Sequence, residues 1–337
     1  MHLYFAADLP PDEATAWLAA LQAAAPGHEW TVHGQAPAGE PARVVQADVA
    51  VVANPPPGSL AQVHGLRFIQ SLWAGVDRLL ADPTVPAHLP LARMVDPTMT
   101  AAMVQSALWA VAALHRGFFH YAEQQRRAVW HQLDQRRASE VRVLVLGLGT
   151  MGAAVASALV AQGYPVTAWR RGGAELASGM PVPPFAPAAD TAPGSVPASV
   201  EVRQGPQGWR EPLAEADVVI NLLPLTPDTR GLFNTDVLSR FKPSAALVNF
   251  GRGGHVVETD LLAALNAGRL AHAVLDVFAT EPLPSEHPFW RHPQVTVLPH
   301  VAALTDLASA AEVVAANLSR LQSGQPLLHL VDRRRGY

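Results

Sequence analysis

The stretch Val141-Arg142-Val143-Leu144-Val145-Leu146, followed directly by Gly147-Leu148-Gly149-Thr150-Met151-Gly152, decides the fold of this chain. The mostly apolar run predicts a strand that is buried on both faces of a parallel sheet. An alanine-rich segment, residues 153–162, follows and predicts a helix. A glycine-rich turn between such a strand and such a helix is typical of dinucleotide-binding folds.

Each glycine of this turn has a physical reason to be there. Gly147 permits the tight turn, Gly149 lets the backbone approach a pyrophosphate, and Gly152 lets the helix pack closely on the strand. The helix start at Thr150 and Met151 would offer N–H groups and a positive dipole end to the phosphates. The alternative is a merely tight strand–helix turn, but a second strand, residues 166–169, favours the dinucleotide site.

The end of that second strand predicts which dinucleotide binds. NAD-binding proteins place an acid about 20 residues after the glycines, where it binds the ribose 2′-hydroxyl. This chain has Ala168-Trp169-Arg170-Arg171 there, and no acid before Glu175. Two guanidinium groups would bind a 2′-phosphate that a carboxylate would repel. We therefore expect Trp169, Arg170 and Arg171 to bind NADP(H), with NAD(H) and solvent-facing arginines as the alternatives.

Strands and helices alternate along the rest of the chain, which predicts a doubly wound α/β fold. Before residue 100, one helix is expected at 13–25. Further helices are expected at 258–267 and 304–322. The expected strands are 3–6, 49–53, 67–71, 217–222, 246–249, 272–276 and 294–298.

Three segments are of another character. Residues 100–115 are apolar nearly all round, as expected of a helix buried between domains or subunits. Residues 118–137 are polar and basic, which indicates a solvated helix face or a helix that crosses a subunit contact. Residues 179–208 are rich in Pro, Gly, Ala and Ser and predict a mobile surface insertion.

Composition excludes several classes of function. The chain has 337 residues, enough for about two domains. It contains no cysteine, so disulfides and thiolate chemistry are excluded, and no metal site is predicted. A formal net charge of −4 gives no indication of the basic surface that nucleic-acid-binding proteins carry. We find no apolar run of about 18 residues and no basic leader, so we expect a cytoplasmic protein without a membrane segment.

Three further turns follow predicted strands. They are Val248-Asn249-Phe250-Gly251-Arg252-Gly253-Gly254, the segment 275–284 with Asp276 and Glu281, and Leu298-Pro299-His300-Val301-Ala302-Ala303. Open α/β sheets bind ligands at the carboxyl ends of their strands, so these turns are candidate site segments. Taken singly, Arg252 could be a surface cation, Glu281 a turn acid and His300 a core histidine.

Together, and in this order, the four motifs resemble those of the D-isomer-specific 2-hydroxyacid dehydrogenases. The resemblance covers roughly residues 45–320. Within that family the chain is most similar to the glyoxylate/hydroxypyruvate reductase A branch, on the strength of residues 72–77, 221–229 and 255–262.

The resemblance implies a catalytic set. His300 would be the general acid that protonates the substrate carbonyl oxygen, and Glu281 would orient its ring and raise its pKa. Arg252 would bind the carboxylate and carbonyl of a 2-oxo acid, and with His300 it would contact the substrate. The N–H groups of Ala74, Gly75 and Val76 would complete the carboxylate site.

It also implies cofactor contacts beyond the glycine turn. Asp276 would accept a hydrogen bond from the nicotinamide carboxamide. The other residues expected to contact the cofactor are Leu223, Pro224, Thr229, Phe250 and Gly251. Phe250-Gly251 departs from the family, which more often has small or hydroxyl residues there. Trp73 also departs, and we hypothesise that it walls the substrate pocket and favours short acids; the alternative is an ordinary core tryptophan.

The predicted architecture is two Rossmann-like doubly wound domains. A flavodoxin-like substrate domain, 1–110 plus 301–337, is interrupted by an NADP-binding domain, 111–300, with the active site in the cleft between them. The predicted function is NADPH-dependent reduction of glyoxylate and hydroxypyruvate to glycolate and D-glycerate, by a homodimer. The alternatives are a dehydrogenase of bulkier substrates or of NAD dependence, and a dinucleotide-sensing corepressor, since fold does not prove turnover.

Overall fold

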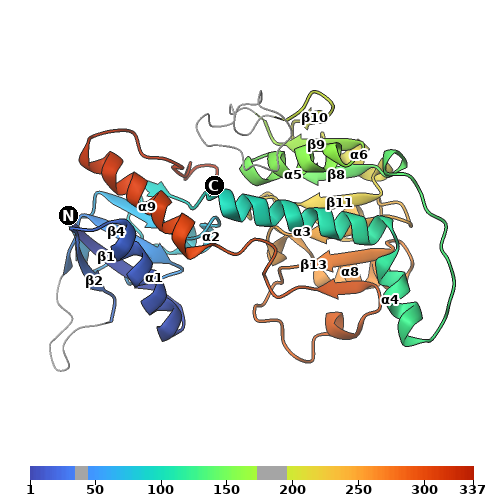
Figure 1. Ribbon diagram of the computed structural model, residues 1–337, viewed down its shortest axis with the longest axis horizontal. Coiled ribbons are helices and arrows are strands. Elements are labelled where there is room, and N and C mark those ends of the chain that lie inside the picture. The colour runs from blue at the N-terminus through green and yellow to red at the C-terminus, as the bar shows by residue number, and fades with distance from the viewer. Residues whose placement is uncertain (35–44, 173–195) are drawn as a thin grey trace. The chain divides into compact units, whose positions relative to one another are not determined.

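The chain folds into two compact units, which we call unit 1 and unit 2 (Figure 1). The computed structural model describes residues 1–34, 45–172 and 196–337. Unit 1 comprises Met1–Thr98 and Thr305–Tyr337, and unit 2 comprises Met99–Leu304. The divisions thus fall at 98 and 304, where the sequence placed them at 110 and 300. The difference at the first arises because most of helix α3 (Pro97–His115) packs into a core of unit 2.

The main sheet of unit 1 is parallel, with strand order β2-β1-β4-β6-β7. Its strands are β1 (His2–Ala7), β2 (Glu29–Val32), β4 (Val49–Ala53), β6 (Phe68–Ser71) and β7 (Leu91–Ala92). A small pair, β3 (Val45–Gln46) with β5 (Val63–His64), lies outside this sheet. In chain order the main sheet therefore runs 2-1-3-4-5, which is the flavodoxin-like order.

The helices of unit 1 are α1 (Pro11–Ala24), α2 (Asp77–Ala81) and α9 (Leu307–Gln322), and α9 lies beside α1 (Figure 1). Asp306 caps α9 by accepting from the Ser309 N–H at 2.9 Å. The fully buried Asn317 of α9 donates to Gln70 Oε1 of β6 at 2.8 Å. This buried polar contact ties the C-terminal segment into the sheet of unit 1.

Unit 2 contains one parallel sheet of order β10-β9-β8-β11-β12-β13-β14. Its strands are β8 (Val143–Leu146), β9 (Val166–Arg170), β10 (Glu201–Gln204), β11 (Val218–Asn221), β12 (Ala246–Asn249), β13 (His272–Leu275) and β14 (Val295–Val297). Counted from β8, the order is 3-2-1-4-5-6-7, the Rossmann order with one added strand. The predicted fold class is confirmed.

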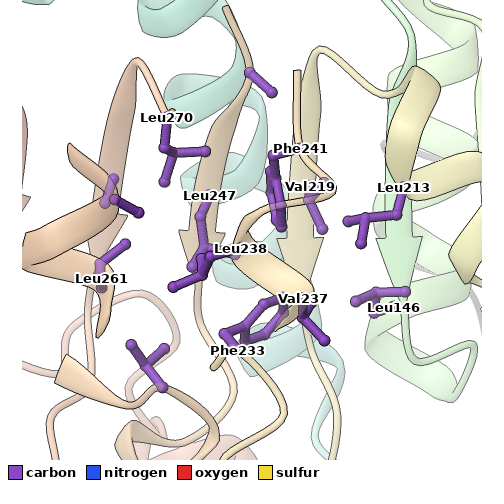
Figure 2. Close-up of a cluster of buried hydrophobic side chains, with 14 of the residues drawn as sticks. Leu146, Leu213, Val219, Phe233, Val237, Leu238, Phe241, Leu247, Leu261 and Leu270 are labelled. Atoms are coloured by element: carbon purple, nitrogen blue, oxygen red, sulfur yellow. The ribbon is translucent and has the colours of Figure 1, made fainter. Parts of the chain in front are cut away.

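Helices cover both faces of this sheet, and alternate strand residues enter two cores. Val143 and Val145 pack with α3 and α5 (Thr150–Ala161), whereas Leu144 and Leu146 pack on the opposite face. Figure 2 shows side chains of that second core, from the sheet and its covering helices. The remaining helices of unit 2 are α4 (Phe118–Arg126), α6 (Arg210–Glu215), α7 (Thr235–Leu238), α8 (Glu258–Asn266) and the short 3-10 turns η1 (Ala138–Glu140), η2 (Gly253–His255) and η3 (Pro288–Arg291).

The structure corrects two predictions for irregular segments. The helix expected over 118–137 ends at Arg126, although α4 has the solvated character predicted, with no buried residue. Of the predicted insertion, 179–195 lies outside the described residues, but 201–204 form strand β10. An edge strand pairs on one side only, so Glu-Val-Arg-Gln needs no apolar run to belong to the sheet.

Helix α3 also corrects the expectation that no segment is long and apolar enough to span a membrane. Its 19 residues pass that test by length and composition, as the only helix to do so in the described part of the chain. Its buried residues, among them Met103, Ala107 and Val111, join the core that α5 and the strands form. The core helix of a globular unit passes the same test, so α3 is weak evidence for a membrane segment.

Candidate active site

The turns predicted to carry chemistry gather at one edge of the unit 2 sheet. Because all its strands are parallel, their carboxyl ends meet at the same edge. Gly147 follows β8, Arg252 lies three residues after β12, and Asp276 directly follows β13. His300 lies three residues after β14, and its N–H donates to the Asp276 carbonyl at 2.9 Å. The edge therefore brings the cofactor motif and the predicted catalytic residues of unit 2 together.

The glycine turn fits a dinucleotide. Gly147 has φ +103°, and a Cβ there would lie 2.9 Å from the Leu222 carbonyl oxygen. At Gly152 a Cβ would lie 1.8 Å from the Gly147 carbonyl oxygen, so only glycine lets α5 pack there. Around Gly149, by contrast, a Cβ would meet open space, and no side chain caps α5. The N–H groups of the first turn of α5, beginning at Thr150 and Met151, are thus accessible to phosphate oxygens.

The end of β9 assigns different roles to its three predicted cofactor residues. The Trp169 side chain lies in a core, and its indole N–H donates to the Gly205 carbonyl at 2.8 Å. Only its backbone faces the turn, where its carbonyl accepts from the Gly147 N–H at 2.9 Å. Arg170 is half-buried, and Arg171 is exposed and pairs with Asp228 at 2.9 Å. The sequence did not single out Asp228, which lies in the loop after β11.

That loop is held by its own side chains. The Thr229 hydroxyl donates to the Pro224 carbonyl at 2.8 Å and accepts from the Thr226 N–H at 2.8 Å. The Leu223 side chain is buried in a core. Thr229 and Leu223 therefore shape the loop, and the backbone of Leu222 and Leu223 borders the glycine turn at Gly147.

A buried polar network supports the Arg252 turn. Asn221 and Asn249 end neighbouring strands in register, and with His255 they are fully buried. Asn221 Nδ2 donates to Asn249 Oδ1 at 2.8 Å and to His255 Nδ1 at 2.9 Å. His255 Nε2 lies 3.2 Å from the Pro224 carbonyl, which can only accept. His255 is therefore the Nε2–H tautomer, with Nδ1 as the acceptor.

This network fixes the backbone on both sides of Arg252. Asn249 Oδ1 accepts from the Gly251 N–H at 3.2 Å, and Asn249 Nδ2 donates to the Arg252 carbonyl at 3.1 Å. The Arg252 N–H donates to His255 Nδ1 at 3.2 Å. A Cβ at Gly251 would lie 2.9 Å from the Leu223 carbonyl oxygen and 3.0 Å from Asn221 Nδ2, so a larger residue would have to shift these groups. The neighbouring Phe250 is buried in a core, not in an open pocket.

His300 and Glu281 form the pair that the sequence predicted. His300 Nδ1 lies 2.8 Å from Glu281 Oε2, and Glu281 Oε1 accepts from the Phe278 N–H at 2.9 Å. Burial alone would raise the pKa of Glu281, but hydrogen bonds from His300 and Phe278 and the charge of Arg252 lower it overall. The pairing engages Nδ1 and leaves Nε2 of the half-exposed His300 as the nitrogen that can meet a ligand.

Asp276 holds the turn that carries His300. Its carboxylate accepts from the Val301 N–H at 2.7 Å and from the Ala302 N–H at 3.0 Å. His300 itself adopts the left-handed region, with φ +57°, so its turn needs such support. Burial raises the pKa of Asp276, although these hydrogen bonds oppose the rise. Both carboxylate oxygens of Asp276 accept hydrogen bonds from backbone N–H groups. The sequence did not predict that Asp276 would support the His300 turn in this way.

In unit 1, the segment Trp73–Val76 follows β6 at its carboxyl end. The Trp73 N–H donates to Ser71 Oγ at 3.0 Å, and its ring packs edge-to-face on Trp17 at 5.7 Å. Among the described residues, no hydrogen bond engages the N–H groups of Ala74, Gly75 and Val76. Three successive N–H groups without an internal acceptor fit the predicted carboxylate-binding role.

Comparisons with known proteins agree with this geometry. Residues 108–302 match the family model described as D-isomer specific 2-hydroxyacid dehydrogenase, NAD binding domain. The chain belongs to this family. It is 37% identical to glyoxylate/hydroxypyruvate reductase A of Serratia proteamaculans, over 95% of this chain and 96% of the relative.

Solved structures of the family have the same fold over their whole length. A D-isomer-specific 2-hydroxyacid dehydrogenase from Xanthobacter autotrophicus Py2, in complex with NADPH and MES, matches with TM-score 0.86 and 35% identity, covering 100% of this chain and 99% of that one. An NADPH-dependent glyoxylate/hydroxypyruvate reductase from Sinorhizobium meliloti, in complex with NADP and sulfate, matches with TM-score 0.86 and 32% identity, with the same coverage. The protein is therefore an oxidoreductase of the 2-hydroxyacid dehydrogenase family.

Proposed function

We propose that this protein reduces short 2-oxo acids, glyoxylate and hydroxypyruvate, to the 2-hydroxy acids with NADPH. The His300–Glu281 pair at 2.8 Å carries the proposal, because it places a proton donor at the same sheet edge as the dinucleotide turn and Arg252. The relatives named glyoxylate/hydroxypyruvate reductase A, similar over nearly the whole chain, support the substrate class.

NADP(H) fits the residues present. The open space at Gly149 and the start of α5 can accept the pyrophosphate, and Arg170 and Arg171 follow at the end of the next strand. Arg171 pairs with the exposed Asp228 at the surface, so a 2′-phosphate would compete with that carboxylate for its guanidinium. The solved relatives that hold NADPH or NADP support this choice of dinucleotide.

The chemistry divides between cofactor and protein. When bound, NADPH would supply the hydride for C2 of the 2-oxo acid. Arg252 binds the substrate carboxylate and polarises the carbonyl, whose oxygen gains negative charge as the hydride arrives. His300, protonated and held by Glu281, transfers a proton to that oxygen, so the product is the neutral hydroxyl of a 2-hydroxy acid. The N–H groups of Ala74–Val76 in unit 1 are proposed as a further carboxylate-binding group.

The test is a comparison of kcat/KM for glyoxylate, hydroxypyruvate and pyruvate, each with NADPH and with NADH. We expect glyoxylate or hydroxypyruvate with NADPH to give the highest value. A higher kcat/KM for pyruvate would contradict the proposed substrate class. A higher kcat/KM with NADH for every acid would contradict the proposed cofactor.

Replacing Arg170 and Arg171 together with alanine is expected to raise KM for NADPH by about 10- to 100-fold, because one or two charge-assisted hydrogen bonds to a 2′-phosphate are lost. KM for NADH should stay nearly unchanged. Arg240→Ala is a matched control, since Arg240 also forms an exposed ion pair, with Asp236 at 3.0 Å. An equal rise for NADPH and NADH would contradict the assignment.

Replacing His255 with leucine is expected to lower kcat by about 10- to 100-fold, because the Arg252 N–H and Asn221 lose their acceptor and the guanidinium loses its fixed position. KM for NADPH should change little. His255→Asn, whose side-chain oxygen can accept at the place of Nδ1, should recover part of the loss. Equal losses in both variants, or a fall in thermal stability without a fall in kcat, would contradict this role.

We also propose that two copies of the chain associate through α3, α4 and the segment that follows. Large apolar side chains are exposed there, and Trp130 is 96% exposed. Exposed apolar surface of this extent is typical of an interface between chains. The exposed residues concerned are Trp109, Phe118, Val129 and Trp130.

A further inference from the structure

Arg93 occupies a distinctive place in unit 1. It directly follows β7, at the carboxyl end of that strand. Its N–H donates to the His329 carbonyl at 3.1 Å, and the N–H of the next residue, Met94, donates to the Trp73 carbonyl at 3.0 Å. Arg93 therefore lies between the C-terminal segment and the loop Trp73–Val76, in which the N–H groups of Ala74, Gly75 and Val76 have no acceptor among the described residues.

Within the part of the chain that the structure describes, the Arg93 guanidinium has no anion to pair with. Among the described residues, no hydrogen bond or ion pair engages it, although the side chain is partly buried. Burial lowers the pKa of Arg93, and no neighbouring charge raises it. Two acids close in sequence to Arg93 and His329 have other partners: Asp96 accepts from Ser309 Oγ at 3.0 Å, and Asp332 accepts from the Arg334 N–H at 2.9 Å. A cation placed away from water without a partner costs free energy.

His329 adds a second polar group without a partner. Its Nε2 is buried, and within the described part of the chain no hydrogen bond reaches it. Burial, and then the charge of Arg93, lower the pKa of His329 to about 4, so the ring is neutral near pH 7. The residue also adopts the left-handed region, with φ +59°, which few residues other than glycine adopt without reason. A neutral imidazole can donate one hydrogen bond through Nε2 to an anion beside Arg93.

We propose that Arg93 and His329 form a carboxylate-binding subsite of unit 1, beside the Trp73–Val76 loop. The inference rests on the proposed function, because it takes the ligand to be the acid substrate. The loop N–H groups carry only partial charges, and Arg93 supplies the full positive charge with a planar fork that matches a carboxylate. The carboxylate has two sources: the C1 group shared by all 2-oxo acids, or the second carboxylate of a 2-oxo dicarboxylic acid.

Kinetics of Arg93→Gln with glyoxylate and with oxaloacetate distinguish the two sources. If Arg93 binds the C1 carboxylate, KM rises about 10- to 100-fold for both acids, the loss expected for a charge-assisted hydrogen bond. If it binds the second carboxylate, KM rises for oxaloacetate alone. KM for NADPH should stay within about two-fold in either case. Arg67→Gln is the matched control, since it removes the same charge from an exposed arginine at the other end of β6.

Two further measurements separate a binding role from a structural one. Because the Arg93 guanidinium has no partner among the described residues, Arg93→Gln should leave the thermal unfolding temperature no lower than Arg67→Gln does. Calorimetric titration of oxalate, with and without NADP⁺, should show weaker binding to Arg93→Gln and intermediate binding to Arg93→Lys, which keeps the charge without the fork. The titration needs no turnover, so it tests the subsite even if the proposed reduction fails. Unchanged KM for both acids together with unchanged oxalate binding, or a selective loss of thermal stability, would overturn the proposal.

Discussion

Replacing His300 with glutamine is expected to lower kcat for glyoxylate reduction by about 10²- to 10⁴-fold, the usual contribution of a positioned general acid. Glutamine can still form a hydrogen bond with Glu281, but it cannot release a proton to the alkoxide that develops as hydride arrives. The affinity for NADPH, measured by fluorescence titration, should not change, because the glycine turn lies after a different strand.

His287→Gln provides the control for this variant. His287 also faces a carboxylate, Glu258, at 3.5 Å in the same unit, but it precedes η3 and does not follow the carboxyl end of a strand. Its replacement should leave kcat nearly unchanged. If His300→Gln retained more than about a tenth of the wild-type kcat, the proton would have to come from another donor, and the proposed role of His300 would be wrong.

Replacing Arg252 with lysine is expected to lower kcat/KM for glyoxylate by about 10²- to 10⁴-fold, nearly as much as Arg252→Gln. The guanidinium can bind carboxylate and carbonyl at once with a rigid fork, whereas an ammonium is a compact charge whose donors do not match that fork, so both contacts lose their geometry. Loss of two charge-assisted hydrogen bonds, each about 1.5–3 kcal/mol, accounts for this range.

The matched change Arg269→Lys, at an exposed arginine beyond α8, should have no effect. The steady-state constants should also separate two parts of the Arg252 effect: a rise in KM for the acid reports lost carboxylate binding, and a fall in kcat reports lost polarisation. If Arg252→Lys were fully active, the fork would not be required, and a simple charge would suffice at this position.

The sequence predicted those parts of the fold that depend on local patterning. The buried run before Gly147 and the glycine turn identify β8 and α5, because Gly147 and Gly152 each answer a steric demand that the structure confirms. The turns with Arg252, Glu281 and His300 could be placed at one edge because parallel strands end on the same side. The distance of 2.8 Å between His300 Nδ1 and Glu281 Oε2 agrees with the pairing that the resemblance to the family implied.

The sequence did not predict features that depend on contacts between distant segments. Trp169 was assigned to the cofactor, but its indole N–H reaches the carbonyl of Gly205, 36 residues away. Strand β10 has no apolar run, and its pairing with β9 decides its conformation. The support of the His300 turn by Asp276 also depends on such a contact, because it connects the segments that follow two different strands.

The buried polar network that supports the Arg252 turn could be predicted in part from the sequence. Asn221 and Asn249 each close an otherwise apolar strand, and buried amides at successive strand ends must find partners. The role of His255 could not be predicted from the sequence. It lies six residues after a strand, and the strand pattern does not determine where its side chain points. Only the fold brings its Nδ1 to 2.9 Å from Asn221.

The most direct test of the account is to mix the protein with NADPH and glyoxylate and to follow the absorbance of the reduced nicotinamide together with the formation of glycolate. The account predicts loss of NADPH in equal amount to glycolate formed, and almost none of either with the His300→Gln variant. Tight binding of NADPH without turnover of glyoxylate, hydroxypyruvate or any other short 2-oxo acid would contradict it, and would instead favour a protein that senses the dinucleotide.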